Sequence, residues 1–401
     1  MSRTADYTIQ GFLYQFNKTI KEILSAENDH TIAVEGIAED IEVISPEATT
    51  AIQCKYHETN TSFTASAVYK PLLQMLNHFS DHPEESIRYV LFAHFAGVVT
   101  PYPTVGKETF EAALSSKDKN LQKYITSLPS SVDLDGFEKK FTMEFGPSYD
   151  ELVTEVSAEL GYNGFAANDI ETLAYPNAIQ IVASLSVKHD QAKRKISKRQ
   201  FLSKLKSIRT TAISHWTLAL RSREKLLQAK RKQLKVQLNK NARLRYFVID
   251  PSRIEDYETE VVLFISDYIG KYHFKPAHIR TPILCLRATR DEVQGIQVRL
   301  FAKGIVSTDG YVGTQFEKAH FFRDPLVSKT AGGEIRREFH IRILSYDDHG
   351  ETLNDRKCDD LFIIGEPSCE GLGTEDINAE RLSGTTMKEV KYVMGVSDVH
   401  E

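Results

Sequence analysis

Residues 31–56 read TIAVEGIAEDIEVISPEATTAIQCKY, and this stretch decides the fold of the N-terminal part of the chain. It contains three short runs rich in β-branched or apolar residues, at 31–35, 41–44 and 51–56. Ser45-Pro46 separates the second run from the third, as turn-forming residues do between strands. We therefore expect three consecutive β-strands here.

The sequences on either side of this stretch predict helices that cover the sheet. Between about residues 8 and 25, apolar residues recur at steps of three and four, as on one face of an amphipathic helix: Phe12, Phe16, Ile20, Ile23 and Leu24. A second helical pattern spans about 65–79, and the almost wholly apolar run 87–95 is typical of a buried strand. The order helix, three strands, helix, strand predicts an α/β core with a mixed sheet.

The polar residues on this core predict a metal site. Gln53 and Lys55 lie two apart in the third strand, so their side chains point to the same face. Asp40 opens the second strand and Glu35 ends the first, close to the mouth of that face. Carboxylate and amide oxygens suit Mg²⁺, and a lysine beside the metal can position water for attack on a phosphodiester. We predict Asp40, Gln53, Lys55 and Glu35 as catalytic residues, with the metal held by Glu35, Asp40 and Gln53.

The strength of this prediction depends on the whole set of residues. A Gln-x-Lys pair alone is weak, because it also occurs on strand faces that simply meet solvent. An acid at the end of one strand, an Asp thirteen residues before the Gln, and the order of elements make the set more specific. We interpret the nearby acids Glu39 and Glu42 as surface charges, although Glu39 replaces Glu35 in the site if the strand register differs by one residue.

Three motifs in this region resemble a known group of nucleases. The runs GFLYQ (11–15), VEGIAEDI (34–41) and IQCK (52–55) are similar to the double-stranded DNA endonuclease domain of bacterial anti-phage effectors. Such domains accompany CBASS nucleotidyltransferases, Lamassu SMC-type ATPases and HerA-type ATPases. They belong to the PD-(D/E)xK restriction-endonuclease-like superfamily. The resemblance covers roughly residues 8–100 and at most extends to about 210, and its motifs are short.

The resemblance implies roles for individual residues. Asp40 corresponds to the metal-binding Asp, Gln53 and Lys55 to the (D/E/Q)xK element, and Glu35 to the upstream acid of resolvase-like members. Gln15 takes a supporting role near the metal. Many superfamily members have Asp or Glu where this chain has Gln53, and an amide is the poorer ligand, but glutamine is ordinary in the resembled group. The implied cofactor is Mg²⁺, with Mn²⁺ as the alternative.

Charge is distributed unevenly along the chain. The net charge is only −5, from 50 Lys and Arg against 55 Asp and Glu. Residues 188–245, however, hold 19 Lys and Arg against two acids and carry +17, which leaves −22 on the remainder. Such a block favours contact with DNA phosphates, for which we predict Lys193, Arg194, Lys195, Lys198 and Arg199. The alternative is a solvated helical face, or a block that meets acidic parts of the protein or of a partner.

The remaining features indicate compartment and domain organisation. The N-terminus lacks the apolar core of a signal peptide, and no apolar run approaches the ~20 residues of a spanning helix, so we expect a cytoplasmic protein. The four cysteines lack zinc-site spacing. We predict a nuclease domain with a helical extension over 1–187, a basic helical segment over 188–245, and a β-rich α+β domain over 246–401. The last prediction rests on short β-like runs at 261–265, 283–286, 297–301, 339–344 and 361–364.

The leading functional interpretation is a Mg²⁺-dependent endonuclease that hydrolyses phosphodiester bonds of double-stranded DNA. The resemblance implies an effector of an anti-phage, abortive-infection system that forms a homo-oligomer and is controlled by assembly with an ATPase of HerA or SMC type. A nuclease activated by a cyclic oligonucleotide, as in CBASS, is one alternative, disfavoured because a fused SAVED sensor is normally larger than residues 246–401. Another is a non-catalytic DNA-binding scaffold.

Overall fold

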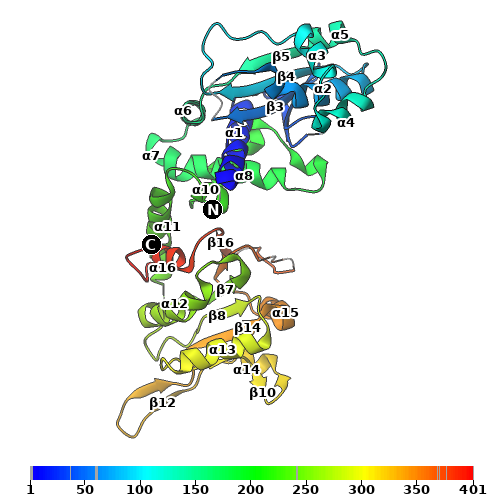
Figure 1. Cartoon of the computed structure of the whole chain (residues 1–401). Coiled ribbons are helices and arrows are strands. Elements are labelled where there is room, and N and C mark those ends of the chain that lie inside the picture. The colour runs from blue at the N-terminus through cyan, green and yellow to red at the C-terminus, as the bar shows by residue number, and fades with distance from the viewer. Residues whose placement is uncertain are drawn as a thin grey trace. The chain divides into compact units, whose positions relative to one another are not determined.

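The computed structural model describes residues 3–36, 38–58, 62–240, 243–367, 369, 371–375 and 377–400, with side chains from residue 8 onward (Figure 1). Ile37, within one of the motifs quoted above, lies outside these residues. The chain divides into two compact units, Met1–Arg209 and Thr210–Glu401. This boundary lies inside the predicted basic segment 188–245, which is therefore shared between the two units. Among the described residues, none of the helices has both the length and the apolar composition needed to cross a bilayer.

The first unit is built on a six-stranded mixed sheet. The strand order is β5-β4-β3-β2-β1-β6. β1, β2 and β3 pair antiparallel, β3, β4 and β5 pair parallel, and β6 adds antiparallel to the free edge of β1. The strands are β1 (Thr31–Val34), β2 (Ile41–Ile44), β3 (Thr49–His57), β4 (Ile87–Phe95), β5 (Phe141–Phe145) and β6 (Lys195–Ile196).

The helices of this unit follow the predicted order around the first four strands. The long helix α1 (Arg3–Ser25) precedes β1, and the 3₁₀ turn η1 (Ala65–Val68) with α2 (Tyr69–Asp81) connects β3 to β4. The helical extension was predicted, but β5 within it was not. Its elements are α3 (Lys107–Leu114), α4 (Lys119–Ser127), α5 (Leu134–Lys140), α6 (Tyr149–Tyr162), α7 (Ala167–Asp169), η2 (Ile170–Ala174), α8 (Tyr175–Ser186), η3 (Gln191–Arg194) and α9 (Lys198–Ser207).

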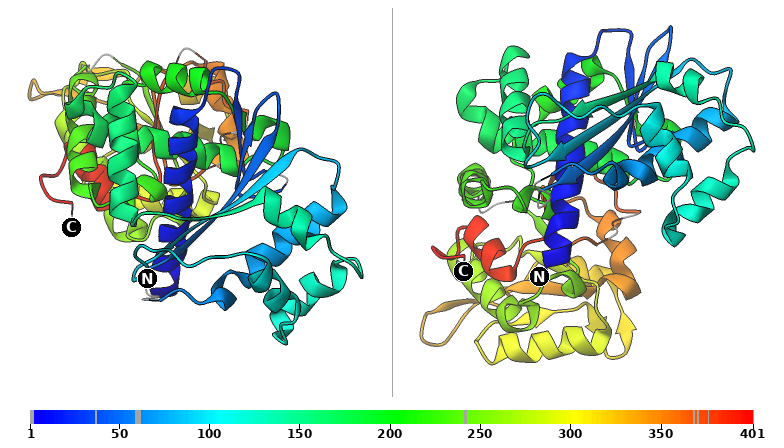
Figure 2. Two further views of the ribbon diagram at one scale, coloured as in Figure 1. Left: turned by 90° about the horizontal axis from the view of Figure 1, so that it is seen from above. Right: turned by 45° about the horizontal axis from the view of Figure 1, so that its top comes forward.

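Different helices cover the two faces of this sheet (Figure 2). Tyr14 of α1 packs with its ring centroid 4.7 Å from that of Tyr56 on one face. On the other face, apolar residues of α2 form a core with Ala51 of β3 and with alternate residues of β4. Because side chains alternate along a strand, Gln53 and Lys55 share the face of Ala51. The structure therefore places the predicted polar pair on the α2 side of the sheet.

The second unit is built on a six-stranded sheet whose strands are all parallel. The order is β16-β15-β7-β8-β14-β9, with helices on both sides of the sheet (Figure 1). The strands are β7 (Arg245–Ile249), β8 (Ile283–Leu286), β9 (Ser307–Thr308), β14 (Ile341–Ser345), β15 (Asp360–Ile364) and β16 (Asn378–Leu382). The helices are α10 (His215–Leu218), α11 (Arg223–Leu238), η4 (Pro251–Arg253), α12 (Tyr257–Tyr272), α13 (Arg290–Phe301), α14 (Lys318–Phe322), α15 (Tyr346–His349), η5 (Gly350–Asp355) and α16 (Met387–Val393). Two small hairpins complete it: β10 (Tyr311–Val312) with β11 (Gln315–Phe316), and β12 (Val327–Lys329) with β13 (Ile335–Arg337).

The prediction of a β-rich α+β domain over 246–401 is wrong. The runs 261–265 and 297–301, interpreted as β-like, lie in α12 and α13. The runs 283–286 and 361–364 do form strands, β8 and β15. A parallel sheet covered on both faces has uniformly apolar strands, and the helices packed against it are also rich in apolar residues. Buried helices and buried strands therefore cannot be distinguished by the composition of a five-residue window. They differ in length and in the spacing of their apolar residues.

Candidate functional site

The tight loop between β1 and β2 carries the acidic part of the candidate site. Glu35 follows β1 in a left-handed conformation with a φ of 51°, which is uncommon for a residue other than glycine. Its N–H donates to the carbonyl of Asp40 at 2.8 Å, and the N–H of Gly36 donates to the carbonyl of Glu39 at 2.9 Å. These bonds close the loop, so Glu35 and Asp40 lie at the same end of the sheet.

Asp40 is attached to β3 through its side chain. The antiparallel register pairs Ile41 with Ile52, which brings Asp40 beside Gln53. One oxygen of Asp40, Oδ2, accepts a hydrogen bond from the backbone N–H of Cys54 at 2.9 Å and another from Nε2 of Gln53. Burial raises the pKa of Asp40 to about 6; the Cys54 N–H and Lys55 oppose the rise, and the nearby Glu35 adds to it. A bound cation would favour the charged carboxylate in the same way as Lys55 does.

Two buried glutamines hold the two predicted carboxylates. Nε2 of Gln53 donates to Asp40, and Nε2 of Gln15 on α1 donates to Oε1 of Glu35 at 2.7 Å. Gln15 was predicted to support the site, and it contacts Glu35. Rotation of the Gln53 amide would turn its oxygen, rather than its N–H, towards the position beside Asp40. The donor set of two carboxylates and an amide oxygen fits Mg²⁺, which prefers oxygen ligands and keeps several waters.

Lys55 is the basic group of the site. It is half-buried in β3, two residues after Gln53 and on the same face. Its positive charge lowers the pKa of both Asp40 and Glu39. With the described residues Lys55 makes no hydrogen bond or ion pair, which leaves its N–H donors available to a phosphate or a water.

Glu39 and Glu42 are not surface charges, contrary to the sequence interpretation. Each is only 8% exposed. Glu42 folds under the β1–β2 loop, where its Oε1 accepts the N–H of Ala38 at 2.7 Å, and a side chain at Gly36 would collide with it. Burial raises the pKa of Glu39 to about 8; the adjacent Asp40 adds to the rise and Lys55 opposes it. Glu39 precedes β2, and the alternation that assigns faces within a strand does not apply in that loop, so its burial could not be predicted from the sequence.

The first part of the basic block lies beside the acidic loop. Strand β6 pairs with β1, matching Ile196 with Ile32 and Lys195 with Ala33. Arg194 donates from Nη1 to the carbonyl of Glu35 at 2.9 Å and from Nε to the carbonyl of Lys188 at 2.6 Å. The helix that follows, α9, begins at the Ser197 cap predicted from the sequence and carries Lys198 and Arg199 in its first turn. Of the five residues predicted to bind DNA, Lys193, Lys195 and Arg199 are exposed, Lys198 is half-buried, and Arg194 holds the loop.

The second part of the basic block has a structural role. At least five of its ten cations form ion pairs with acids of the C-terminal unit, so the alternative in which the block meets acidic parts of the same protein applies to those five. The pairs with the shortest distances are Arg223–Glu389 at 2.7 Å, Lys230–Glu380 at 2.5 Å, Arg231–Asp398 at 2.5 Å and Arg243–Asp360 at 2.5 Å. Arg245 adds a buried pair to Asp360 at 3.2 Å. These five cations are therefore poorly placed to contact phosphates.

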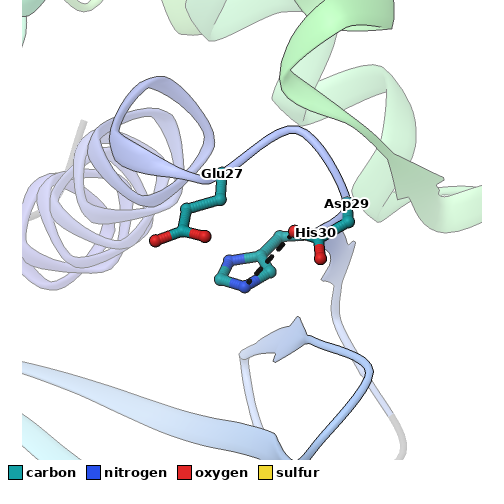
Figure 3. A group of neighbouring side chains, drawn as sticks. All are labelled: Glu27, Asp29 and His30. Carbon is teal, nitrogen blue, oxygen red and sulfur yellow. Dashed lines mark ion pairs between the residues drawn. The ribbon is translucent and has the colours of Figure 1, made fainter.

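A group of metal-ligand type was not anticipated from the sequence. Glu27, Asp29 and His30 place ligand atoms within 4.8 Å of one another, with His30 Nε2 3.8 Å from Asp29 Oδ1 (Figure 3). Glu27 and Asp29 are exposed, and the group precedes β1, whereas Glu35 follows that strand. Exposed carboxylates gather in this way without a metal, so we assign the group no role.

The second unit contains two cavities. One of about 600 Å³ is lined by Tyr246, Lys357 and residues of the loop after β15. The other, of about 800 Å³, is lined mainly by residues 346–355, which follow β14. Both cavities are bordered by Asn354, Gly371 and Leu372.

The order of the strands in the second sheet creates a topological switch point. The chain leaves β7 towards β8 on one side and later returns to β15 on the other side, so the switch point lies between β7 and β15.

Comparison with known proteins gives only a distant likeness. No protein-family model matches the chain, and no curated protein matches it. Among solved structures, it is similar to the Cap4 SAVED/CARF-domain containing receptor of Acinetobacter baumannii, in complex with the cyclic trinucleotide 3′3′3′-cAAA, in complex with 2′3′3′-cAAA, and in a third structure of the receptor. The identities are 12–13%, the matches cover 88% of this chain and 90% of the other, and the TM-score is 0.28. A TM-score of this size does not establish a common fold, so the function is inferred from the chain's own residues.

Proposed function

We propose that this chain is a Mg²⁺-dependent endonuclease that hydrolyses phosphodiester bonds of double-stranded DNA on a restriction-endonuclease-like core. The observation that supports this most is the attachment of Asp40 to β3 at Gln53 and Cys54, with Lys55 on the same strand face as Gln53. Glu35 joins them because the β1–β2 loop closes through its own backbone hydrogen bonds. Four residues predicted from the sequence therefore occupy one end of one sheet.

In this proposal each residue has a defined task. Asp40, Glu35 and the reoriented amide of Gln53 hold the metal, and Gln15 keeps the carboxylate of Glu35 in place. The bound metal polarises a phosphoryl oxygen and lowers the pKa of a coordinated water. Lys55 positions that water and stabilises the negative charge that develops on the phosphate, because its N–H donors are available on the same face.

DNA binding is assigned to the basic residues at the β6 edge of the sheet. β6 pairs with β1, and Arg194 donates to the carbonyl of Glu35, so the segment 193–199 lies next to the acidic loop. Exposed lysine and arginine side chains there would neutralise phosphates on either side of the scissile bond, without reading bases. Binding by such contacts weakens steeply as salt concentration rises.

The test is cleavage of supercoiled plasmid by the full-length chain with Mg²⁺ or Mn²⁺, alone and with an ATPase encoded beside it. Asp40→Asn and Lys55→Ala should each lower the cleavage rate by about 100-fold or more, while the temperature of unfolding shows that both variants fold. Cleavage that persists in both variants would refute the catalytic assignment. If the folded wild type cleaves neither under these conditions nor with the cyclic nucleotides considered below, the chain is a non-catalytic DNA-binding subunit.

We further propose that the nuclease is an effector of an anti-phage system and that assembly controls it. An unregulated endonuclease would destroy the DNA of its own cell, so its activity has to depend on a signal. The support for a homo-oligomer assembled with an ATPase of HerA or SMC type is the resemblance of the three N-terminal motifs. Co-purification of the chain with that ATPase, and cleavage only in the complex, is the expected outcome.

Control by a small ligand is a second candidate, because the second unit has the architecture of a ligand-binding sheet. The size argument against a cyclic-oligonucleotide sensor assumed residues 246–401, whereas the unit spans Thr210–Glu401. Open parallel sheets bind ligands outside the carboxyl ends of their strands at a switch point, here between β7 and β15. Plasmid cleavage by the chain alone, assayed with a panel of cyclic di- and trinucleotides, distinguishes this candidate from control by an ATPase.

A further inference from the structure

Glu39 is a buried carboxylate without a visible partner in the middle of the candidate site. It is 8% exposed, and its Oε1 makes no hydrogen bond to any described residue. Buried polar atoms nearly always have a partner, and an isolated buried carboxylate costs far more free energy than a hydrogen-bonded one. An oxygen left in this state inside a compact hairpin therefore indicates a missing ligand.

The backbone around Glu39 fixes where its side chain starts. The carbonyl of Glu39 accepts the N–H of Gly36 at 2.9 Å, and the carbonyl of the next residue, Asp40, accepts the N–H of Glu35 at 2.8 Å. The residue is thus held on both sides by the closed loop. Burial and the charges of Asp40 and Glu42 raise the pKa of this carboxyl group, and only the positive charge of Lys55 lowers it.

Glu42 is a natural comparison for Glu39, because the two side chains are equally buried in the same hairpin. The Oε1 atom of Glu42 accepts the N–H of Ala38 at 2.7 Å, so this acid is accounted for by the loop that it supports. The corresponding atom of Glu39 has no such donor among the described residues. A role in supporting the hairpin, as for Glu42, therefore does not explain why position 39 carries a glutamate.

We propose that Glu39 is a metal-binding residue, which together with Asp40 holds a divalent cation. This inference rests on the proposed function and extends its set of ligands. Mg²⁺ in proteins is usually held by one or two carboxylates and completes its octahedron with water and substrate oxygens, so two adjacent acids suffice. The three acids Glu35, Asp40 and Glu39 do not gather their oxygens within 4.8 Å in the described structure. Glu39 and Asp40 are neighbours in sequence, so we add Glu39 to the ligands of the proposed site beside Asp40.

A divalent cation suits this position better than a further lysine contact does. The charge of Lys55 lowers the pKa of both Asp40 and Glu39, so one positive charge has to balance two negative ones before Glu42 is considered. A cation of charge +2 that bridges Asp40 and Glu39 would balance both and would leave Lys55 free for the phosphate.

The test is titration of the full-length chain with Mn²⁺, followed by electron paramagnetic resonance of the free ion. Glu39→Gln keeps the shape of the side chain and removes its charge, and it should weaken Mn²⁺ binding by about tenfold or more. The matched control is Glu42→Gln, an equally buried acid in the same hairpin, which should change the affinity less than about threefold. Asp40→Asn should weaken binding at least as much as Glu39→Gln does.

The outcomes separate the inference from the proposed function. If Asp40→Asn weakens Mn²⁺ binding and Glu39→Gln does not, the assignment of Glu39 is wrong and the nuclease proposal stands. If neither change affects binding, the metal site itself is wrong. An equal loss in Glu42→Gln would trace the effect to the hairpin fold and also overturn the assignment.

A second readout protects the test against misfolding. Without metal, Glu39→Gln should unfold at the same temperature as the wild type or a higher one, because it removes a buried acid whose ionisation is disfavoured by burial. Added Mn²⁺ should raise the unfolding temperature of the wild type and of Glu42→Gln, but much less that of Glu39→Gln. If Glu39→Gln does not fold, Glu39→Asp replaces it, and undiminished Mn²⁺ affinity in that shortened variant refutes the proposal.

Discussion

Replacement of Lys230 by methionine tests whether the second part of the basic block holds the protein together. Lys230 is 2% exposed, and its Nζ lies 2.5 Å from Oε2 of Glu380, which is 4% exposed. The only other hydrogen bond recorded for that carboxylate in the described structure is from Thr210 Oγ1, at 3.3 Å. Lys230→Met would leave the charge of Glu380 buried without its cation, which typically costs about 3–5 kcal/mol.

The assay is urea unfolding followed by tryptophan fluorescence. Trp216 is the only tryptophan of the chain and belongs to α10, so its signal reports on the second unit. With a slope of about 2 kcal/mol per molar urea, the expected loss lowers the unfolding midpoint by roughly 1.5–2.5 M. The matched control is Lys235→Met, an exposed lysine on the same helix, for which we expect a loss below about 0.5 kcal/mol.

The double variant Lys230→Met/Glu380→Met completes a double-mutant cycle, which shows whether the loss in Lys230→Met comes from leaving Glu380 without its cation. Because it removes both buried charges, it should recover most of the stability that the single variant loses, and replacement of buried ion pairs by apolar residues is often neutral or stabilising. The reasoning fails if Lys230→Met costs no more than Lys235→Met. In that case the cations of residues 221–245 are not committed to structure, and DNA contact by this segment has to be reconsidered.

Three further predictions concern DNA binding, pH and backbone geometry. The exposed cations of the β6 edge are neutralised together in the triple variant Lys193→Gln/Lys195→Gln/Arg199→Gln. The negative slope of log affinity against log salt, measured by fluorescence anisotropy with duplex DNA, should become shallower by up to about 2.7. An unchanged slope places the DNA elsewhere. Burial beside two arginines lowers the pKa of His273 to about 3, below its unfolded value of about 6.5. The unfolded state therefore binds the extra proton between these values, so the stability of the wild type relative to His273→Gln should fall as pH drops from about 6.5 towards 3, by up to about 1.4 kcal/mol per pH unit. A stability difference between the wild type and His273→Gln that stays constant over this pH range contradicts the prediction. Gly365 has a φ of +79°, and an added Cβ would lie 2.9 Å from a backbone oxygen of the loop after β7. Gly365→Ala should therefore destabilise the second unit by about 1–3 kcal/mol in the same urea assay. A variant as stable as the wild type would refute this prediction.

The elements predicted best from the sequence are those with strong local signals. β2 and β4 have the predicted bounds of 41–44 and 87–95, because each consists mostly of apolar, strand-forming residues and is flanked by clear breaks. The predicted residues Asp40 and Gln53 meet because a hairpin register follows from alternation and turn length. The candidate site was predictable to the extent that it is built from neighbours in sequence.

The features that sequence reasoning missed depend on distant contacts or on burial in a loop. β6 has two residues and forms only because the β1 edge is free to receive it, about 160 positions earlier in the chain. Glu39 looks like any exposed acid in a turn, and only the folded hairpin shows that it is buried. In the second unit, apolar composition does not distinguish α12 from the strands that it covers, so the parallel sheet was taken for a β-rich domain.

Single-turnover cleavage of a labelled DNA duplex by the full-length chain, with the partner or ligand that activates the wild type in the plasmid assay, tests the central claim most directly. The comparison is between the wild type and Lys55→Met, at a Mn²⁺ concentration that electron paramagnetic resonance shows to saturate both. If the face of β3 is a phosphodiesterase site, Lys55→Met will still bind metal and DNA but will cleave about 100-fold more slowly or worse. Cleavage by Lys55→Met at the rate of the wild type would contradict the account, because no other part of it supplies the group that Lys55 provides.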